Sequence, residues 1–155
     1  MTRIWCAATV AVFASAAQAE LRDEAVVIDP EQLWIEVNET FELMWLGPNL
    51  SERTQALSGA DIEIVTLATD PDSAAILGVR ALVVVTPGTH SCENLGDPQE
   101  YYVVALDPAL TTDGPLTTCE EMTVSITSGM ITLEADPMSD EGSFYAWAPG
   151  KGFSN

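Results

Sequence analysis

Short stretches of alternating or unbroken apolar residues follow one another from residue 61 onward, and turn-forming residues separate them. The segment 61–68 alternates around Ile62 and Ile64, which is typical of a strand with one buried face. The segment 79–86 is an almost continuous β-branched run, as expected of a strand buried on both faces. The Ser-Gly pair at 128–129 predicts a tight hairpin turn. The remaining strand candidates are 101–107, 122–128, 130–135 and 143–148.

The segment 33–46 has two interpretations that its pattern leaves open. Leu33, Val37 and Phe41 fall at helical spacing, and a helix built on them would stop at Gly47. The same segment also divides into two halves that are rich in β-branched and aromatic residues. Because such residues are enriched in strands, we favour two strands over one helix.

Two other segments bear on the helix content and on the turns. Asp29 before Pro30 has the pattern of a helix start, which allows one short N-terminal helix. The stretch 69–78 has the composition of a loop with room for one helical turn, and 107–118 is rich in turn formers. Together these patterns predict a mainly β fold, an antiparallel sheet or sandwich of about six to eight strands.

The first twenty residues have the organisation of a secretory signal peptide. Arg3 precedes a short apolar run, and small residues follow up to Ala19, so we predict cleavage after Ala19. Residues 1–19 would be removed and 20–155 would form a single secreted domain. The apolar run is shorter than the roughly 20 residues that span a bilayer, and no later run is suited to stable membrane insertion. The Ala-rich leader is typical of bacteria, which predicts the periplasm or the medium as the location.

Cleavage would also remove Cys6 and leave two cysteines, Cys92 and Cys119. An even pair in an oxidising compartment predicts a disulfide. The two residues are 27 positions apart, and chain entropy values a crosslink of that span at roughly 3–4 kcal/mol. The disulfide would staple the segments on either side of the strand 101–107.

Acidic residues dominate the charge of the chain. It contains 24 Asp and Glu against 5 Lys and Arg, and loss of the leader with Arg3 changes the net formal charge from −19 to −20. Nucleic-acid binding and attraction to anionic membranes are excluded, because both need clustered basic residues. Two interpretations remain open. The acids are either an adaptation to a salty habitat or a surface that steers a cationic partner.

His90, the only histidine of the chain, lies two positions before Cys92. A Cys/His nucleophile would need a free thiolate, which a disulfide removes. His90, Cys92, Cys119 and Met122 are also ligand types that copper uses, yet no CxxC, HxH or Met-rich run concentrates them. We therefore interpret this stretch as a crosslink with a histidine in the adjacent turn.

Two acidic turns have the side chains that a calcium ion prefers. The first contains Asp70 and Asp72, and the second contains Asp136, Asp140 and Glu141. Closely spaced carboxylates are typical calcium ligands, but neither stretch matches the EF-hand loop. Asp is also an ordinary turn former, so the two turns are weak candidates for a metal site.

The sequence lacks four motifs that mark common classes of enzyme. GxSxG, HExxH, a P-loop and GxGxxG are all absent. With so many acids, a pair of carboxylates suited to hydrolysis would arise by chance. We therefore expect a protein that is not an enzyme and that uses no cofactor.

The arrangement of cysteines and strands has one resemblance. A cysteine precedes a Tyr-rich strand, a second lies in the T-x-C turn Thr117-Thr118-Cys119, and a hairpin and a Trp-bearing strand follow. Over about half of the chain, residues 79–153, this unit resembles an uncharacterised group of bacterial periplasmic β-proteins with paired cysteines. The resemblance implies no activity.

The functional hypothesis that follows is a non-catalytic secreted binding or interaction protein. In its most specific form the protein is inhibitor-like and uses its acidic surface against a basic partner such as a lysozyme. The alternative is a calcium- or metal-binding protein, or a small hydrolase, that uses the acidic turns.

Overall fold

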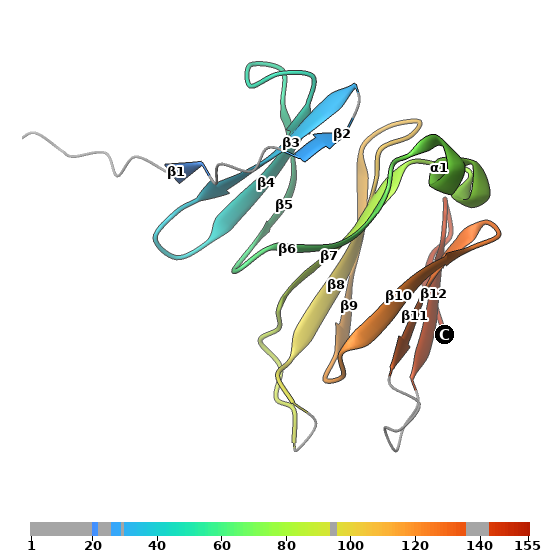
Figure 1. Cartoon of the computed structure of the whole chain (residues 1–155). Helices are drawn as coiled ribbons and strands as arrows, with labels where there is room; N and C mark the ends of the chain where they lie inside the picture. The colour runs from blue at the N-terminus through green and yellow to red at the C-terminus, as the bar shows by residue number, and fades with distance from the viewer. Residues whose placement is uncertain (1–19, 22–25, 29, 94–95, 136–142) are drawn as a thin grey trace, which may run out of the picture.

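The computed structural model describes residues 20–21, 26–28, 30–93, 96–135 and 143–155 (Figure 1). These form three antiparallel sheets and one short helix, and each sheet is built from strands that are consecutive in the sequence. The mainly β, antiparallel prediction is confirmed. The sheets of the described part contain five, four and four strands, which is more than the expected total of about six to eight. The predicted signal peptide lies outside the described residues.

The first sheet is the blue and cyan part of Figure 1. Its strands are β1 (Glu20–Leu21), β2 (Val26–Ile28), β3 (Glu31–Val37), β4 (Glu42–Gly47) and β5 (Thr54–Gly59). They pair in the order β1-β3-β4-β5, and β2 also pairs with β3. The two strands favoured for the segment 33–46 are confirmed, with Ile35 opposite Met44 in the β3–β4 pair.

The prediction of a short helix that starts near Pro30 is wrong. Strand β3 begins at Glu31, and its Gln32 pairs with Val27 on one side and with Gly47 on the other. Asp29 itself lies outside the described residues. Pairing on both sides of β3 outweighs a local helix-start pattern, because propensity is a weak prior against tertiary contacts.

The central sheet has the strand order β6-β7-β8-β9. Its strands are β6 (Glu63–Ala68), β7 (Ala81–Pro87), β8 (Gln99–Ala105) and β9 (Thr111–Thr118). Sequence analysis treated the last of these as turns because it contains Gly114 and Pro115. Strand β9 tolerates both residues because it is an edge strand with a register shift opposite Tyr101–Val103. A Cβ at Gly114 would lie 2.8 Å from the Tyr101 carbonyl oxygen, so only glycine fits there.

The third sheet has the strand order β10-β11-β12-β13. Its strands are β10 (Met122–Thr127), β11 (Met130–Ala135), β12 (Phe144–Ala148) and β13 (Gly152–Ser154). The tight hairpin predicted at 128–129 is confirmed, since Thr127 pairs with Met130 across it. Gly129 supplies the positive φ of 76° that the turn requires.

The helix α1 (Pro71–Leu77) occupies the stretch expected to be a loop with one helical turn. Asp70 caps its first turn by accepting hydrogen bonds from the backbone N–H groups of Asp72 and Ser73. Gly78 ends it in the left-handed conformation. No helix in the described part of the chain has the length and apolar character that a membrane span requires.

The two middle strands of the central sheet, β7 and β8, are buried on both faces by the other two sheets. Ala81 and Val83 of β7 pack into a core shared with the third sheet, and Leu82 and Val84 pack into a second core shared with the first. All four side chains are fully buried. The almost continuous apolar run at 79–86 therefore has the two-sided burial that its pattern predicted. Figure 1 shows the central sheet between the two outer sheets.

Arg80, at the entry to β7, ties the first sheet to the central one. Its guanidinium donates to both carboxylate oxygens of Asp107, at 2.8 and 2.9 Å, and to both of Glu31, at 2.6 and 3.3 Å. These hydrogen bonds, first to Asp107 and then to Glu31, raise the pKa of Arg80 above its already high ordinary value. The side chain is partly buried. Because its pKa is raised, the guanidinium remains charged, and it links β3 to the segment that follows β8.

Two-sided burial makes a direct prediction about stability. Leu82→Ala should lower the free energy of unfolding by about 2–5 kcal/mol, because it leaves a cavity against the first sheet. Leu50→Ala, the same change at a side chain that is 53% exposed, should stay within about 0.5 kcal/mol of the wild type. Urea denaturation followed by tryptophan fluorescence measures both. Equal effects in the two variants would contradict burial of the Leu82 face.

Candidate functional site

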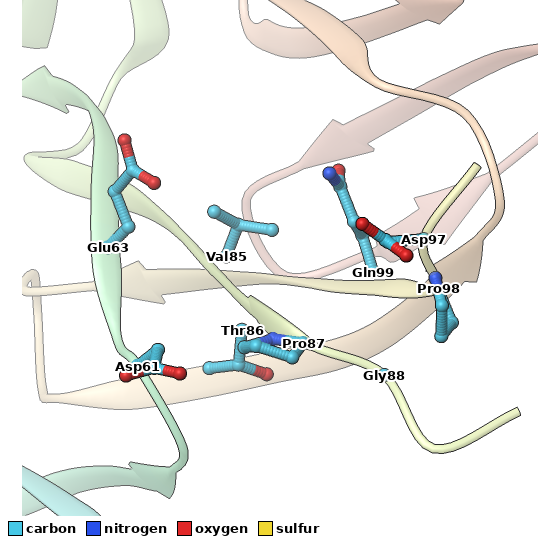
Figure 2. Close-up of a pocket in the computed structure, with 9 residues that line it drawn as sticks. All are labelled: Asp61, Glu63, Val85, Thr86, Pro87, Gly88, Asp97, Pro98 and Gln99. Atoms are coloured by element: carbon cyan, nitrogen blue, oxygen red, sulfur yellow. The ribbon is translucent and has the colours of Figure 1, made fainter.

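A pocket of about 400 Å³ lies beside the central sheet where β7 ends, and we call it the acidic cleft. It is formed by the start of β6, the end of β7 and the start of β8. Its lining residues are Asp61, Glu63, Val85, Thr86, Pro87, Gly88, Asp97, Pro98 and Gln99. Figure 2 shows the end of β7 between Asp61 and Glu63 on one side and Asp97 and Gln99 on the other.

The register of the strand pairs determines which residues lie next to one another in the lining of the acidic cleft. Glu63 is the cross-strand partner of Val85, and Pro87 is the partner of Gln99. Beyond the last strand pair, the Gly88 N–H donates to the Pro98 carbonyl at 2.7 Å, which holds the two chain segments together. The cleft is therefore anchored to the buried strands β7 and β8 and to the start of the edge strand β6.

Asp61 turns the chain from the first sheet into the central one. Its φ of 42° lies in the left-handed region, which Asp tolerates better than most residues. The next residue, Ile62, is buried, and its backbone N–H donates to the buried carboxylate of Glu42 at 2.7 Å. This corner leaves Asp61 exposed at the rim of the acidic cleft.

The acidic cleft is strongly negative. Asp61, Glu63 and Asp97 are exposed, and none of its lining residues is Lys, Arg or His. The nearest apolar surfaces are Val85 and the two prolines. Such a pocket offers carboxylate oxygens above an apolar floor, which suits the positively charged end of a side chain with an apolar stem.

Both arginines of the described strands and loops are engaged elsewhere. Arg80 is held by Glu31 and Asp107. Arg53 donates to Glu36 at 3.2 Å and stacks over the Trp45 ring at 4.4 Å from its centroid. Neither arginine lines the acidic cleft, so neither neutralises it.

Two tyrosines of β8 connect the acidic cleft to the cores. The Tyr101 hydroxyl donates to Oε1 of Gln99 at 2.6 Å and accepts from the Met122 N–H at 3.1 Å. Burial raises the pKa of Tyr101, and the charge of Glu63 adds to that rise. For Tyr102, burial together with the hydrogen bond to Glu100 raises the pKa to about 12.

The predicted disulfide between Cys92 and Cys119 is confirmed, with a Cα–Cα distance of 5.5 Å. It joins the β7–β8 connection to the β9–β10 connection. Beside it lies a second hollow of about 360 Å³, which we call the disulfide cavity. The residues that line it are His90, Thr117, Thr118, Cys119, Glu120, Ser143 and Tyr145. The cysteines are not free nucleophiles in this state, as the sequence interpretation expected.

The structure describes two of the five calcium candidates, Asp70 and Asp72. Asp70 acts as the N-cap of α1, and the backbone and side-chain hydrogen bonds from Ser73 lower its pKa. Capping accounts for the position of Asp70, and Asp72 lies in the first turn of the same helix. The remaining candidates, Asp136, Asp140 and Glu141, lie outside the described residues.

The acids of the cleft do not stand out in the sequence. Asp61 and Glu63 flank a strand start, and Asp97 precedes Pro98 in a turn, so each position looked ordinary by itself. Glu63 and Asp97 are 34 positions apart in the sequence. The β6–β7 and β7–β8 pairings bring their segments together, and only the high density of acids pointed towards such a site.

The raised pKa of Tyr102 determines how the stability of the fold should depend on pH at alkaline values. The folded-state pKa of Tyr102, about 12, lies above its ordinary value of 10.0. Its contribution to stability is therefore complete below pH 10 and is lost as the pH rises towards 12. Glu100→Gln should shift the ionisation of Tyr102 to lower pH, because it removes the carboxylate that opposes the tyrosinate. Ultraviolet titration measures the shift, and Tyr102→Phe identifies the signal. An unchanged titration curve in Glu100→Gln would refute the coupling.

Comparison with known proteins does not add a candidate function. No protein-family model, no curated protein and no solved structure matches this chain.

Proposed function

We propose that this protein is a non-catalytic binding protein of the periplasm or the extracellular space, and that it recognises a cationic partner through the acidic cleft. One observation carries the proposal. Asp61, Glu63 and Asp97 surround a pocket of about 400 Å³ whose lining contains no basic residue. A pocket of this volume accommodates a basic side chain from a partner protein.

The chemistry of the acidic cleft matches a lysine or arginine in two ways. The apolar stem of either side chain can pack on Val85 and the prolines, and the charged end can reach the carboxylates at the rim. A guanidinium can bind carboxylate oxygens through charge-assisted, bidentate hydrogen bonds. The carboxylates are exposed, so binding does not require complete burial of uncompensated charge.

The charge of the whole chain supports the same proposal. With 24 acids and 5 basic residues, the surface attracts cations over a distance and raises their association rate. Their ion pairs hold Arg53 and Arg80, the two arginines of the described residues, away from the acidic cleft. The disulfide supports a location in an oxidising compartment.

A charge-matched pair of double variants tests the site. Glu63→Gln with Asp97→Asn should weaken the binding of a triarginine peptide, and of lysozyme as a folded basic protein, by about tenfold, since each exposed charge contact contributes up to about 1 kcal/mol. The control, Glu121→Gln with Glu134→Gln, removes the same charge from exposed positions outside the acidic cleft. It should bind almost as the wild type does. Isothermal titration calorimetry at low and high salt gives the affinities and their screening.

Three results would overturn the proposal. Equal losses in the two double variants would mean that net charge alone attracts cations. If neither probe bound at low salt, the proposal of a cationic partner would be excluded. Calcium that raises the melting temperature and displaces the peptide would instead assign the acidic cleft to a metal ion.

A further inference from the structure

We infer that reduction of the Cys92–Cys119 disulfide converts the disulfide cavity into a binding site for a single zinc ion. The site would consist of His90, Cys92 and Cys119. The Glu120 carboxylate lines the same cavity but lies outside the cluster of these three residues, so its side chain would have to turn towards the ion to act as the fourth ligand. It is separate from the acidic cleft and does not depend on the function proposed for it.

The geometry of three ligand residues carries the inference. One ligand atom from each of His90, Cys92 and Cys119 lies within 4.8 Å of the other two. In a tetrahedral zinc site, with Zn–S of about 2.3 Å and Zn–N of about 2.0–2.1 Å, neighbouring ligand atoms are roughly 3.6–3.8 Å apart. The backbone already places the two cysteines 5.5 Å apart at Cα. Side-chain rotation after reduction would therefore suffice to reach zinc geometry.

Two buried polar atoms beside the disulfide point to a ligand. Nδ1 of His90 and Oε1 of Glu120 are inaccessible to solvent and have no hydrogen-bond partner among the described residues. Both residues line the disulfide cavity. Buried polar atoms are nearly always paired, so two unpaired ones at one cavity suggest that an ion or another polar ligand belongs there.

The position of His90 is fixed by close packing. Its ring lies so near Gly88 that a Cβ at that glycine would be 2.9 Å from Nδ1. Gly88 is in turn held by the hydrogen bond to Pro98. The imidazole is thus held beside the sulfur atoms by the end of the central sheet, which is the kind of support that a metal ligand needs.

The donor set fits zinc in particular. Thiolate, imidazole and carboxylate are its usual ligands, and a site with two cysteines and one histidine is among the known zinc arrangements. Within the described part of the chain, these three residues form the only cluster of three or more His, Cys, Asp or Glu side chains close enough to hold a metal.

The zinc site would form in two chemical steps, reduction of the disulfide and binding of the ion. A dithiol reductant transfers two electrons and two protons to the disulfide, giving two protein thiols and the oxidised, disulfide form of the reductant. Zinc then replaces the protons of both thiols, so two protons leave for each ion bound. Thiol–disulfide exchange with an oxidising disulfide, which accepts two electrons and takes up two protons to become a dithiol, re-forms the Cys92–Cys119 bond, removes two ligands and releases the ion. The site therefore couples zinc binding to the thiol redox state.

Cobalt titration tests the inference, because Co²⁺ occupies zinc sites and thiolate ligation gives it an intense charge-transfer absorption. The disulfide is reduced with a phosphine, which is converted to the phosphine oxide with the oxygen of water, and the reagent is removed without air. The reduced protein should bind one equivalent of Co²⁺ with tetrahedral absorption bands, and Zn²⁺ should displace it. The oxidised protein should show no such bands.

Three variants identify the ligands. In the reduced state, Cys92→Ser with Cys119→Ser should lose the charge-transfer band. His90→Ala should lose more affinity than the roughly 10–100-fold that removal of an outer-shell partner costs. Glu120→Gln should bind Co²⁺ more weakly than Glu121→Gln, which removes the same charge from the neighbouring exposed position. Circular dichroism reports whether each reduced chain is folded. If reduction unfolds the wild type, zinc should restore its near-ultraviolet signal.

Several outcomes would overturn the inference. A reduced wild-type chain that neither binds Co²⁺ nor refolds with zinc would exclude the site. Equal Co²⁺ affinity in reduced wild type and His90→Ala would mean that the thiolates act alone. Equal affinity in Glu120→Gln and Glu121→Gln would remove the carboxylate from the ligand set.

Discussion

Burial of the two middle strands of the central sheet on both faces is the constraint on which the rest of the molecule depends. A strand such as β7, with Ala81 and Val83 on one side and Leu82 and Val84 on the other, has no face left for water. It requires a covering layer on each side, and the first and third sheets supply these layers. Specific polar contacts then fix the layers. Arg80 binds Glu31 of the first sheet, and the Trp147 indole of the third sheet donates to Asp113 of β9 at 2.7 Å.

Both sites lie where this sheet stops being covered. The acidic cleft forms at the end of β7, and the disulfide cavity lies beyond it at the connections that leave β7 and β9. The strands give both sites a rigid base, and the connections supply their chemistry. This division between scaffold and connections is common in proteins whose binding residues are positioned by a rigid core. The acidic cleft has a charge pattern suited to cations, whereas the disulfide cavity combines sulfur, nitrogen and oxygen donors.

The sequence predicted features that depend on local composition and missed those that depend on register. The apolar run at 79–86, the hairpin at 128–129 and the cysteine pair each follow from residues that are sufficient by themselves. Strand β9 was missed because Gly114 and Pro115 read as a turn, and only its edge position and register shift make them acceptable. The acidic cleft was missed because Glu63 and Asp97 meet only through the β6–β7 and β7–β8 pairings. The same limit applies to the proximity of His90 and Glu120 at one cavity.

The sequential order of the sheets has a consequence for the folding of the chain. Each sheet pairs strands that are neighbours in sequence, so most pairings are local and can form early. The central sheet nevertheless cannot bury its second face until residues beyond 121 have joined it. Until then, the run of apolar residues in β7 is exposed, and such segments promote aggregation. The large excess of negative charge opposes association of partly folded chains by mutual repulsion. The acids would thus protect a core that is completed only by the residues after 121.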